Sequence, residues 1–198
     1  KYTHGYGVTL SRVDKITSSG QPDMLIDSIP PVSRVDEINI KRPEIYFGEL
    51  TSNYALVNTS EDEFDYPDGN SNKYARYEGD AGIKLNPINR LMFAIREHSL
   101  KTLVSGNIKS DSKILINRKI SERVQEIMPY LSYDKDPYMV TENGKLYWII
   151  DAYTHTANYP YSEPYNNETR TNYIRNSIKV VIDAYNGNTD YYIVDDTD

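Results

Sequence analysis

Two carboxylates stand close together in the segment PEIYFGEL, where Glu44 and Glu49 flank Tyr46 and Gly48. A pair of carboxyl groups can act as general acid and base in glycoside cleavage when the two lie roughly 5–9 Å apart. The segment therefore admits a hydrolase that uses Glu44 and Glu49. It is more typical of a short strand and tight turn, in which the carboxylates only cap backbone N–H groups.

The densest acidic run, SEDEFDYPDGN, occupies residues 60–70. Its carboxylates surround a turn signal of Pro and Gly, and oxygen ligands of this kind are what Ca²⁺ prefers. Asp62, Asp65 and Asp68 are therefore candidate calcium ligands. The run lacks the spacing of an EF-hand loop and its final Glu, so a solvated acidic loop is the alternative.

The three histidines are scattered, and His4 and His155 have the settings that best suit a binding site. Each follows a threonine in a tyrosine-rich segment, whereas His98 lies in a segment predicted to be helical. The chain has no His-Glu-x-x-His pair, no Gly-x-Ser-x-Gly motif and no phosphate-binding loop. Cysteine is absent, which excludes a disulfide framework, a thiolate metal site and a cysteine nucleophile.

Tyrosine is the compositional outlier, with 19 Tyr against 3 Phe and 1 Trp. A phenol ring buries apolar area and keeps a polar tip that needs a partner or water. Sugar-binding platforms and protein interfaces use such rings, and so do ordinary β-rich domains. Tyr6, Tyr46, Tyr159 and Tyr161 are therefore candidate ligand-binding residues.

The formal net charge of −7 is unevenly distributed along the chain. Residues 84–123 carry nine Lys or Arg against three Asp or Glu, so the remainder is strongly acidic. An acidic chain without a nucleic-acid motif repels phosphate backbones, which argues against nucleic acid as a partner. The basic middle can face an anionic surface, or it can be the solvated side of helices packed against acidic neighbours.

No apolar run exceeds five residues, whereas a membrane-spanning helix needs about 20. No signal peptide is visible, and the opening residues KYTHGYGVTL already have the character of a strand. We therefore expect a piece of a longer protein whose targeting segments lie outside it.

Turn signals and short β-like runs fill residues 1–82, a helical pattern follows in 86–128, and hairpin strands fill 137–198. The expected strands of the first part are Tyr6–Leu10, Met24–Ser28, Ile45–Phe47, Asn53–Asn58 and Lys73–Tyr77. We predict one α+β domain, mostly an antiparallel sheet of hairpins, with about two main helices in its middle.

The first of these helices is expected to begin with Asn86 as N-cap and Pro87 at the first helical position. Gly106 suits its left-handed C-terminal position. Apolar residues recur near helical spacing within it: Ile88, Leu91, Met92, Ile95 and Leu103.

The second helix is expected to span about residues 118–128, before the stop at Pro129. Its apolar face carries Ile120, Val124 and Ile127. Residues 113–116 are either a short strand or the first turn of this helix.

The tetrapeptide IDAY occurs twice, at residues 150–153 and 182–185. Because side chains alternate along a strand, the two copies predict equivalent strands of one antiparallel sheet. The shared apolar face carries Leu146, Trp148, Ile150 and Ala152, and Ile178, Val180, Ile182 and Ala184. An Asp near a strand end typically accepts N–H bonds at a turn, so the repeat indicates a structural device. Residues 154–176 between the copies are expected to form an ordered loop packed on the sheet.

Several segments together resemble one protein family. They are YTHGYGV, RPEIYFGEL, EFDYPDG, YEGDAGI, GKLYWIIDAYT and NYIRNSIKVVIDAYNG, in this order over nearly the whole chain. The combination is similar to the extracytoplasmic part of large bacterial multi-pass membrane proteins grouped as uncharacterised protein family 0182. The resemblance implies a domain outside the plasma membrane, with the transmembrane part of its own full-length chain as a partner. It implies no activity and carries over no catalytic residue.

The residues admit functions of different classes. The favoured one is a non-catalytic extracytoplasmic module that binds an envelope ligand or a partner protein, and its candidate contacts are His4, Tyr6, Glu44, Tyr46, Glu49, His155, Tyr159 and Tyr161. The alternative is an envelope hydrolase that cleaves glycan or peptide with a carboxylate pair. A third possibility is an assembly surface that organises the membrane part.

Overall fold

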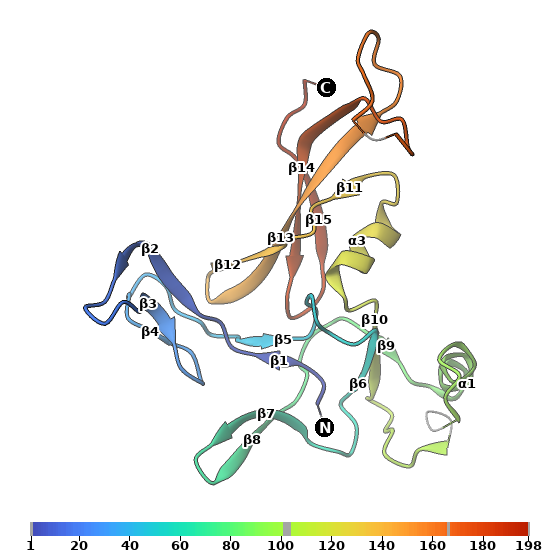
Figure 1. Ribbon diagram of the computed structural model, residues 1–198. Helices are drawn as coiled ribbons and strands as arrows, with labels where there is room; N and C mark the ends of the chain where they lie inside the picture. The colour runs from blue at the N-terminus through green and yellow to red at the C-terminus, as the bar shows by residue number, and fades with distance from the viewer. Residues whose placement is uncertain (1, 101–103, 166, 198) are drawn as a thin grey trace.

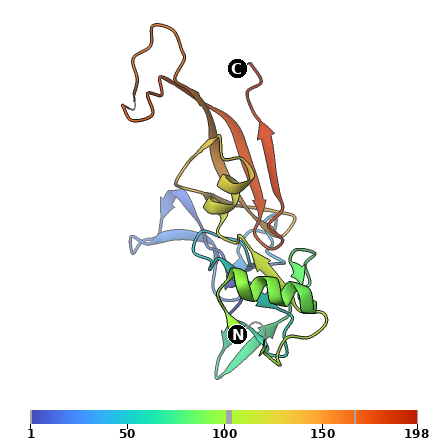
Figure 2. The same cartoon turned by 90° about the vertical axis from the view of Figure 1, so that its right-hand side faces the viewer.

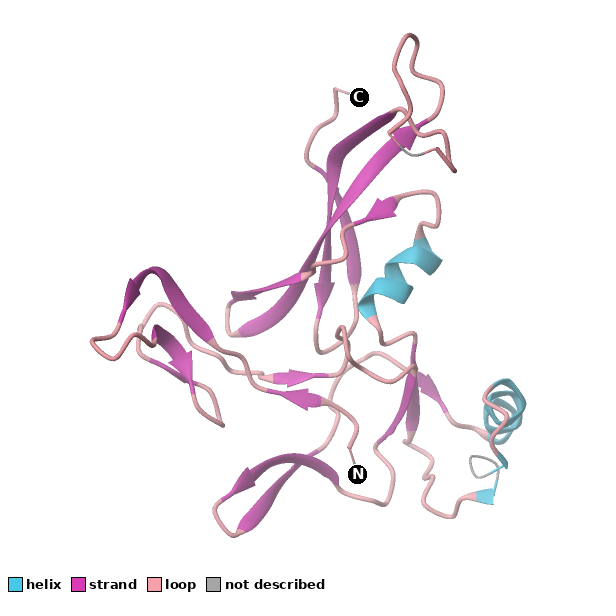
Figure 3. Cartoon of the chain, in the orientation of Figure 1, coloured by secondary structure: helices cyan, strands magenta, loops and turns pink. Residues whose placement is uncertain are grey.

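The computed structural model describes residues 2–100, 104–165 and 167–197. Figures 1 and 3 show a chain of short antiparallel strands with little helix. Within the described residues, one five-stranded sheet lies in the C-terminal part, and four smaller sheets precede it. The helices α1 (Pro87–Arg96) and α3 (Ile120–Ile127) lie in the middle of the described chain. The predicted α+β class with mostly antiparallel strands is confirmed.

The C-terminal sheet is built on two long strands that pair with each other. Its members are β11 (Ser132–Tyr133), β12 (Tyr138–Glu142), β13 (Lys145–Thr156), β14 (Tyr173–Asp183) and β15 (Thr189–Ile193). The register sets Trp148 opposite Ile182 and Ile150 opposite Val180. Ile150, Val180 and Ile182 are buried, so the shared apolar face that the alternation predicted is confirmed.

The two IDAY copies lie on neighbouring strands, and only the second ends at a turn. Asp183 Oδ1 accepts hydrogen bonds from the backbone N–H groups of Tyr185 (2.8 Å) and Asn186 (2.9 Å). This is the capping role that the sequence predicted. Asp151 lies in the middle of β13 instead, and it pairs with Lys179 of β14. The repeat therefore marks strand pairing and carries no duplicated site.

Residues 157–172 connect β13 to β14 and extend beyond the end of the sheet (Figure 1). The Asn172 side chain fastens this loop, because it accepts the N–H of Tyr159 at 3.1 Å and donates to the Tyr159 carbonyl at 2.8 Å. The Tyr159 ring also stacks on Tyr173, with centroids 5.0 Å apart. The prediction that the loop packs on the sheet is wrong. The strands stay paired up to Thr156, so the loop begins where the sheet ends.

The smaller sheets precede this one in the chain. Their strands are β1 (Gly5–Tyr6), β2 (Leu10–Ile16), β3 (Pro22–Asp27), β4 (Val32–Ser33), β5 (Glu44–Ile45), β6 (Tyr54–Val57), β7 (Glu63–Asp68), β8 (Ser71–Ala75), β9 (Ile83–Lys84) and β10 (Lys113–Ile116). They associate as β1–β5, β2–β3–β4, β7–β8 and β6–β10–β9.

Two segments of this part differ from the sequence prediction. The acidic run contains the strand β7, in which Phe64 pairs with Tyr74, and it is therefore not a loop. Pro67 is tolerated because the β7–β8 hairpin is a two-stranded sheet whose register shifts before it. The predicted strand Tyr6–Leu10 is also wrong, since Gly7 has a φ of 100° and separates β1 from β2.

α1 begins where the sequence predicted, and it ends earlier. The Asn86 side chain accepts the N–H of Asn89 at 2.8 Å, which confirms the N-cap. The helix ends at Arg96 because His98 takes a left-handed φ of 49° and closes the last turn. The expectation that Gly106 closes it is therefore wrong.

The apolar row that predicted α1 does not face the core. The buried residues of α1 are Phe93 and Ala94, and Phe93 packs with Leu85 and Ile114. The described residues of the row are all exposed: Ile88, Leu91, Met92 and Ile95. Leu103, which was expected to continue the row, lies outside the described residues.

α3 confirms the second helix, with Ile120 and Val124 buried against the C-terminal sheet. Residues 113–116 are the strand β10, which resolves the two alternatives. Among the described residues, β10 thus lies between α1 and α3 in the chain. Among the described residues, no helix is long and apolar enough to cross a bilayer.

The main core lies between the C-terminal sheet, α3 and the segment after β5. It includes three tyrosines, Tyr46, Tyr77 and Tyr185, whose ring centroids lie 4.6–5.1 Å apart. Their hydroxyls are used, since Tyr46 donates to Glu63 and Tyr77 donates to Asn186. Part of the tyrosine enrichment is therefore structural.

Candidate functional site

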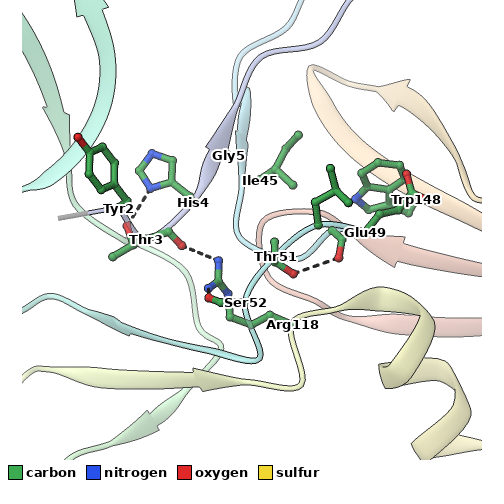
Figure 4. Close-up of a pocket in the computed structure, with 12 residues that line it drawn as sticks. Tyr2, Thr3, His4, Gly5, Ile45, Glu49, Thr51, Ser52, Arg118 and Trp148 are labelled. Atoms are coloured by element: carbon green, nitrogen blue, oxygen red, sulfur yellow. Dashed lines mark hydrogen bonds between the residues drawn. The ribbon is translucent and has the colours of Figure 1, made fainter. Parts of the chain in front are cut away.

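A pocket of about 430 Å³ opens between the N-terminal segment and the loop that follows β5 (Figure 4). Distant parts of the chain line it: residues 2–5, Ile45, residues 48–52, Arg118 and Trp148. This volume lies in the range of small-molecule and side-chain binding sites.

The pocket has apolar walls and an exposed rim. Tyr2, Ile45, Leu50 and Trp148 supply the apolar lining. Leu50 is 100 % exposed and Tyr2 is also exposed, so both offer apolar surface to solvent. Trp148 is fixed in place, because its indole N–H donates to the Phe47 carbonyl at 3.0 Å. Exposed apolar side chains beside a fixed indole ring suit the binding of an apolar group.

Arg118 also lines the pocket, although it is only 3 % exposed. Its guanidinium donates to the carbonyls of Thr3 (2.5 Å) and Tyr46 (2.7 Å). It further donates to Ser52 Oγ (3.0 Å) and the Tyr54 carbonyl (3.4 Å). Burial lowers the pKa of Arg118 to about 10, because the charged form loses its hydration. The side chain thus ties the N-terminal segment to the β5–β6 loop and holds the pocket open.

His4 connects the pocket to buried carboxylates on β7. Thr3 Oγ1 donates its one hydrogen to Glu63 Oε2 at 2.6 Å, so it must accept from His4 Nδ1 at 3.0 Å. His4 Nε2 lies 3.1 Å from Asp65 Oδ1. His4 thus bridges Thr3 and Asp65, and these contacts tie the N-terminal segment to β7.

The order hydroxyl, imidazole, carboxylate in Thr3, His4 and Asp65 resembles that of a hydrolytic triad. In a triad the imidazole takes the proton of the nucleophile, whereas here Thr3 donates to Glu63 and accepts from His4. Thr3 is also only 5 % exposed. The arrangement anchors the N-terminal segment on β7 and is not set up for nucleophilic attack.

Glu44 lies on the opposite side of β5 from the pocket. Because side chains alternate along a strand, Ile45 faces the pocket, and Glu44 faces away beside its cross-strand partner Tyr6. Burial raises the pKa of Glu44, and its Oε2 has no hydrogen-bond partner within the described part of the chain. Glu49 lines the pocket, so the two carboxylates do not face each other in it.

The raised pKa of Glu44 predicts a pH-dependent stability. Above the ordinary value of 4.5 this carboxyl ionises in the unfolded chain, while burial opposes its ionisation in the folded one. Stability is therefore lost as the pH rises from 4.5 through the raised pKa. Glu44→Gln, which cannot ionise, should be more stable than wild type at neutral pH, by less than about 1 kcal/mol because the side chain is half-buried.

Thermal unfolding of both proteins across the acidic and neutral range checks this. The two melting temperatures should converge below pH 4.5 and separate above it. A Glu44→Gln variant that is no more stable than wild type at neutral pH would show that the carboxyl is adequately solvated.

The other candidate residues lie at the far end of the molecule. His155 is near the end of β13, where its Nδ1 lies 3.3 Å from Ser132 Oγ. Tyr159 and Tyr161 belong to the loop 157–172 and are exposed. Figures 1 and 2 place this loop and the N-terminus at opposite ends of the molecule. The structure therefore brings His4 and Glu49 to the pocket, and it leaves His155, Tyr159 and Tyr161 apart from it.

The three candidate calcium ligands have separate environments. Asp65 contacts His4, Asp68 pairs with Lys73 at 3.2 Å, and Asp62 is exposed. Across the described ranges, no three His, Cys, Asp or Glu side chains come together in a way that could hold a metal ion. The structure therefore does not gather Asp62, Asp65 and Asp68 into a calcium site.

Sequence reasoning missed most of the residues that form the pocket. Leu50 follows Glu49 directly and could have been found as an exposed apolar residue after a turn. Trp148 was assigned to the sheet face alone, and its indole N–H also reaches the segment before Gly48. No pattern in the sequence around Arg118 predicts that its side chain is buried in the lining of a pocket.

Comparison with known proteins places the chain among relatives of undetermined function. The sequence model described as "Uncharacterised protein family (UPF0182)" matches residues 1–198. A UPF0182 protein of Alkaliphilus metalliredigens is 56% identical over 198 residues, which are 100% of this chain and 21% of that protein. UPF0182 proteins of Clostridium botulinum strain Okra and Clostridium acetobutylicum are each 55% identical over 197 residues, or 22% and 21% of their lengths.

The chain thus spans about a fifth of the length of these curated relatives. No solved structure matches it.

Proposed function

The chain belongs to the uncharacterised protein family UPF0182, and from this premise we propose that it is an extracytoplasmic binding module of a larger plasma-membrane protein. Its partners on this proposal are the transmembrane part of its own full-length chain and an envelope ligand or partner protein with an apolar group. The chain covers only 21% and 22% of the length of two of its relatives. This supports the proposal that it is one part of a longer polypeptide.

The pocket carries the binding half of this proposal. Its apolar walls are open to solvent at Leu50 and Tyr2, and buried hydrogen bonds of Arg118 hold its shape. A preformed concave site that exposes Tyr2, Leu50 and Trp148 favours a ligand with an apolar group, because little ordering is needed on binding.

The hydrolase is less well supported. Glu49 faces the pocket without Glu44, and the hydroxyl and imidazole nearby are engaged with Glu63 and Asp65. Catalysis by a carboxylate pair needs an acid and a base that flank one bond, and Glu49 faces the pocket without Glu44 as its partner.

Trp148 provides a direct test, because it is the one tryptophan of the chain and it lines the pocket. Anilinonaphthalene sulfonate, an apolar probe with an anionic group, should quench Trp148 emission by energy transfer when it binds there. The double variant Tyr2→Ser/Leu50→Ser removes exposed pocket wall and should weaken this quenching on the order of tenfold. Because both residues are exposed, stability should stay near that of wild type.

Tyr161→Ser is the matched control, since it removes an exposed tyrosine far from the pocket and should leave the quenching unchanged. Equal quenching in the double variant and wild type would refute a ligand site at this pocket. Short peptides and glycan fragments can then compete with the probe. Release of new chain ends from those fragments would support the hydrolase instead.

A further inference from the structure

β15 lies at an edge of the C-terminal sheet. It pairs with β14 alone, and Figure 2 shows it as the outermost strand on that side of the sheet. Within the part of the chain that the structure describes, no backbone hydrogen bond joins the outer side of β15 to another segment. An unpaired row of N–H and C=O groups at a sheet edge is a template for a further strand.

The register between β14 and β15 shows which backbone groups are unpaired. Val194 N–H donates to the Ser177 carbonyl at 2.8 Å, at one end of the pairing. Because an antiparallel ladder alternates between hydrogen-bonded and non-hydrogen-bonded pairs, Asp190 and Tyr192 also direct their backbone groups toward β14. The residues that alternate with them direct theirs outward: Thr189, Tyr191 and Ile193.

Other edge strands carry features that discourage pairing with a further strand, and β15 lacks them. β2 contains Arg12, Asp14 and Lys15, and its register with β3 is irregular. The β7–β8 hairpin contains Pro67 and a register shift. At the opposite edge of the C-terminal sheet, residues 37–41 lie beside the end of β12. β15 pairs in regular register and contains no Lys, Arg or Pro, so its edge is unprotected.

The edge of β15 is complementary to itself. About a two-fold axis at Tyr191, Thr189 of one copy lies opposite Ile193 of the other, so that outward backbone groups meet outward backbone groups. Asp190, the one charged residue of β15, then lies opposite Tyr192, whose hydroxyl can donate to the carboxylate. An axis at Asp190 would instead bring two carboxylates together. Charge therefore favours the axis at Tyr191.

We propose that two copies of this chain associate through β15, so that their C-terminal sheets form one continuous antiparallel sheet. The pairing adds main-chain hydrogen bonds along the edge, as in other cases of strand addition. It also covers the side chain of Ile193, which is 71 % exposed in the single chain. Because β15 does not line the pocket, the inference is independent of the proposed ligand site and goes beyond it.

Sedimentation velocity over a series of protein concentrations tests this. Wild type should dimerise with a Kd of about 10–100 μM, because a contact between two short strands is small. Tyr192→Asp sets a carboxylate opposite Asp190 of the other copy, on both sides of the axis, and should raise the Kd on the order of tenfold. Tyr192→Lys sets an ammonium there and should leave the Kd unchanged or lower it.

Effects on folding run in the opposite direction to these effects on the dimer. Within one chain residue 192 lies opposite Lys179, so Tyr192→Asp gains a neighbour of opposite charge and Tyr192→Lys gains one of like charge. Unfolding therefore cannot account for a dimer that only Tyr192→Asp weakens. Tyr138→Asp is the matched control, because it replaces an exposed tyrosine at the opposite edge of the sheet. This variant should dimerise like wild type.

Amide hydrogen exchange followed by NMR adds a readout for single residues. The N–H groups of Tyr191 and Ile193 should exchange slowly only at concentrations at which the dimer forms, whereas those of Asp190 and Tyr192 are bonded to β14 and should be protected in the monomer too. A wild type that stays monomeric at about 1 mM would overturn the proposal. So would a dimer on which Tyr192→Asp and Tyr192→Lys have equal effects, because its contact would then not be the one described.

Discussion

Arg118→Ala is expected to lower the free energy of unfolding by about 4 kcal/mol, because it opens a cavity and leaves buried carbonyls without donors. The carbonyls of Thr3 and Tyr46 each accept from this guanidinium. They belong to the N-terminal segment and the segment after β5, which the β1–β5 pairing also joins, so the loss should loosen the lining of the pocket around Arg118 without separating these segments. Urea denaturation of both proteins measures the difference.

Two further variants separate the causes of this loss. Arg118→Met fills most of the volume and removes the cost of burying a charge, so its loss should be only about 2 kcal/mol. Arg118→Lys keeps the charge, but an ammonium cannot match the planar fork that reaches several acceptors. It should therefore be no more stable than Arg118→Met. A loss below about 1 kcal/mol in Arg118→Ala would show that water replaces the guanidinium donors.

Local patterns predicted the elements whose partners are close in the chain. The Asn143–Gly144 turn has φ values of 53° and 84°, as a type I′ hairpin requires, and it sets the register between β12 and β13. The alternation of apolar and polar residues around Trp148 predicted the buried face of β13. Asn86 predicted the start of α1. In each case a few neighbouring residues contain the whole physical cause.

Other features depend on contacts that a sequence pattern does not contain. The apolar period of α1 predicted a helix, but a period does not say which side the fold covers. His98 could replace Gly106 at the helix end, because a left-handed conformation is open to a non-glycine residue at a modest energy cost. The strand β7 was obscured by its acidic composition, although Glu63 is buried and accepts from Thr3 and Tyr46.

The candidate site could be predicted only in part for the same reason. Residue type pointed to His4 and Glu49, and both line the pocket. Their association with Arg118 and Trp148 joins segments about a hundred residues apart, which no local spacing encodes. The tyrosine content indicated binding surfaces, whereas Tyr46, Tyr77 and Tyr185 use their rings in the core.

Trp148→Ala is expected to destabilise the protein by about 3 kcal/mol, at the lower end for a large aromatic residue because the ring is only partly buried. The indole packs on the main core and closely approaches Gly48, while its N–H bonds to the Phe47 carbonyl. Loss of the ring therefore affects both the sheet and the segment after β5.

Trp148→Phe isolates the hydrogen bond, because it keeps most of the ring packing and removes the donor to Phe47. Its loss should be about 1 kcal/mol, since the freed carbonyl lies beside an open pocket that water can enter. Urea denaturation followed by circular dichroism measures both variants without needing tryptophan emission. If Trp148→Ala were no less stable than Trp148→Phe, packing of the ring would add nothing to stability, and the hydrogen bond to the Phe47 carbonyl would account for any loss in both variants.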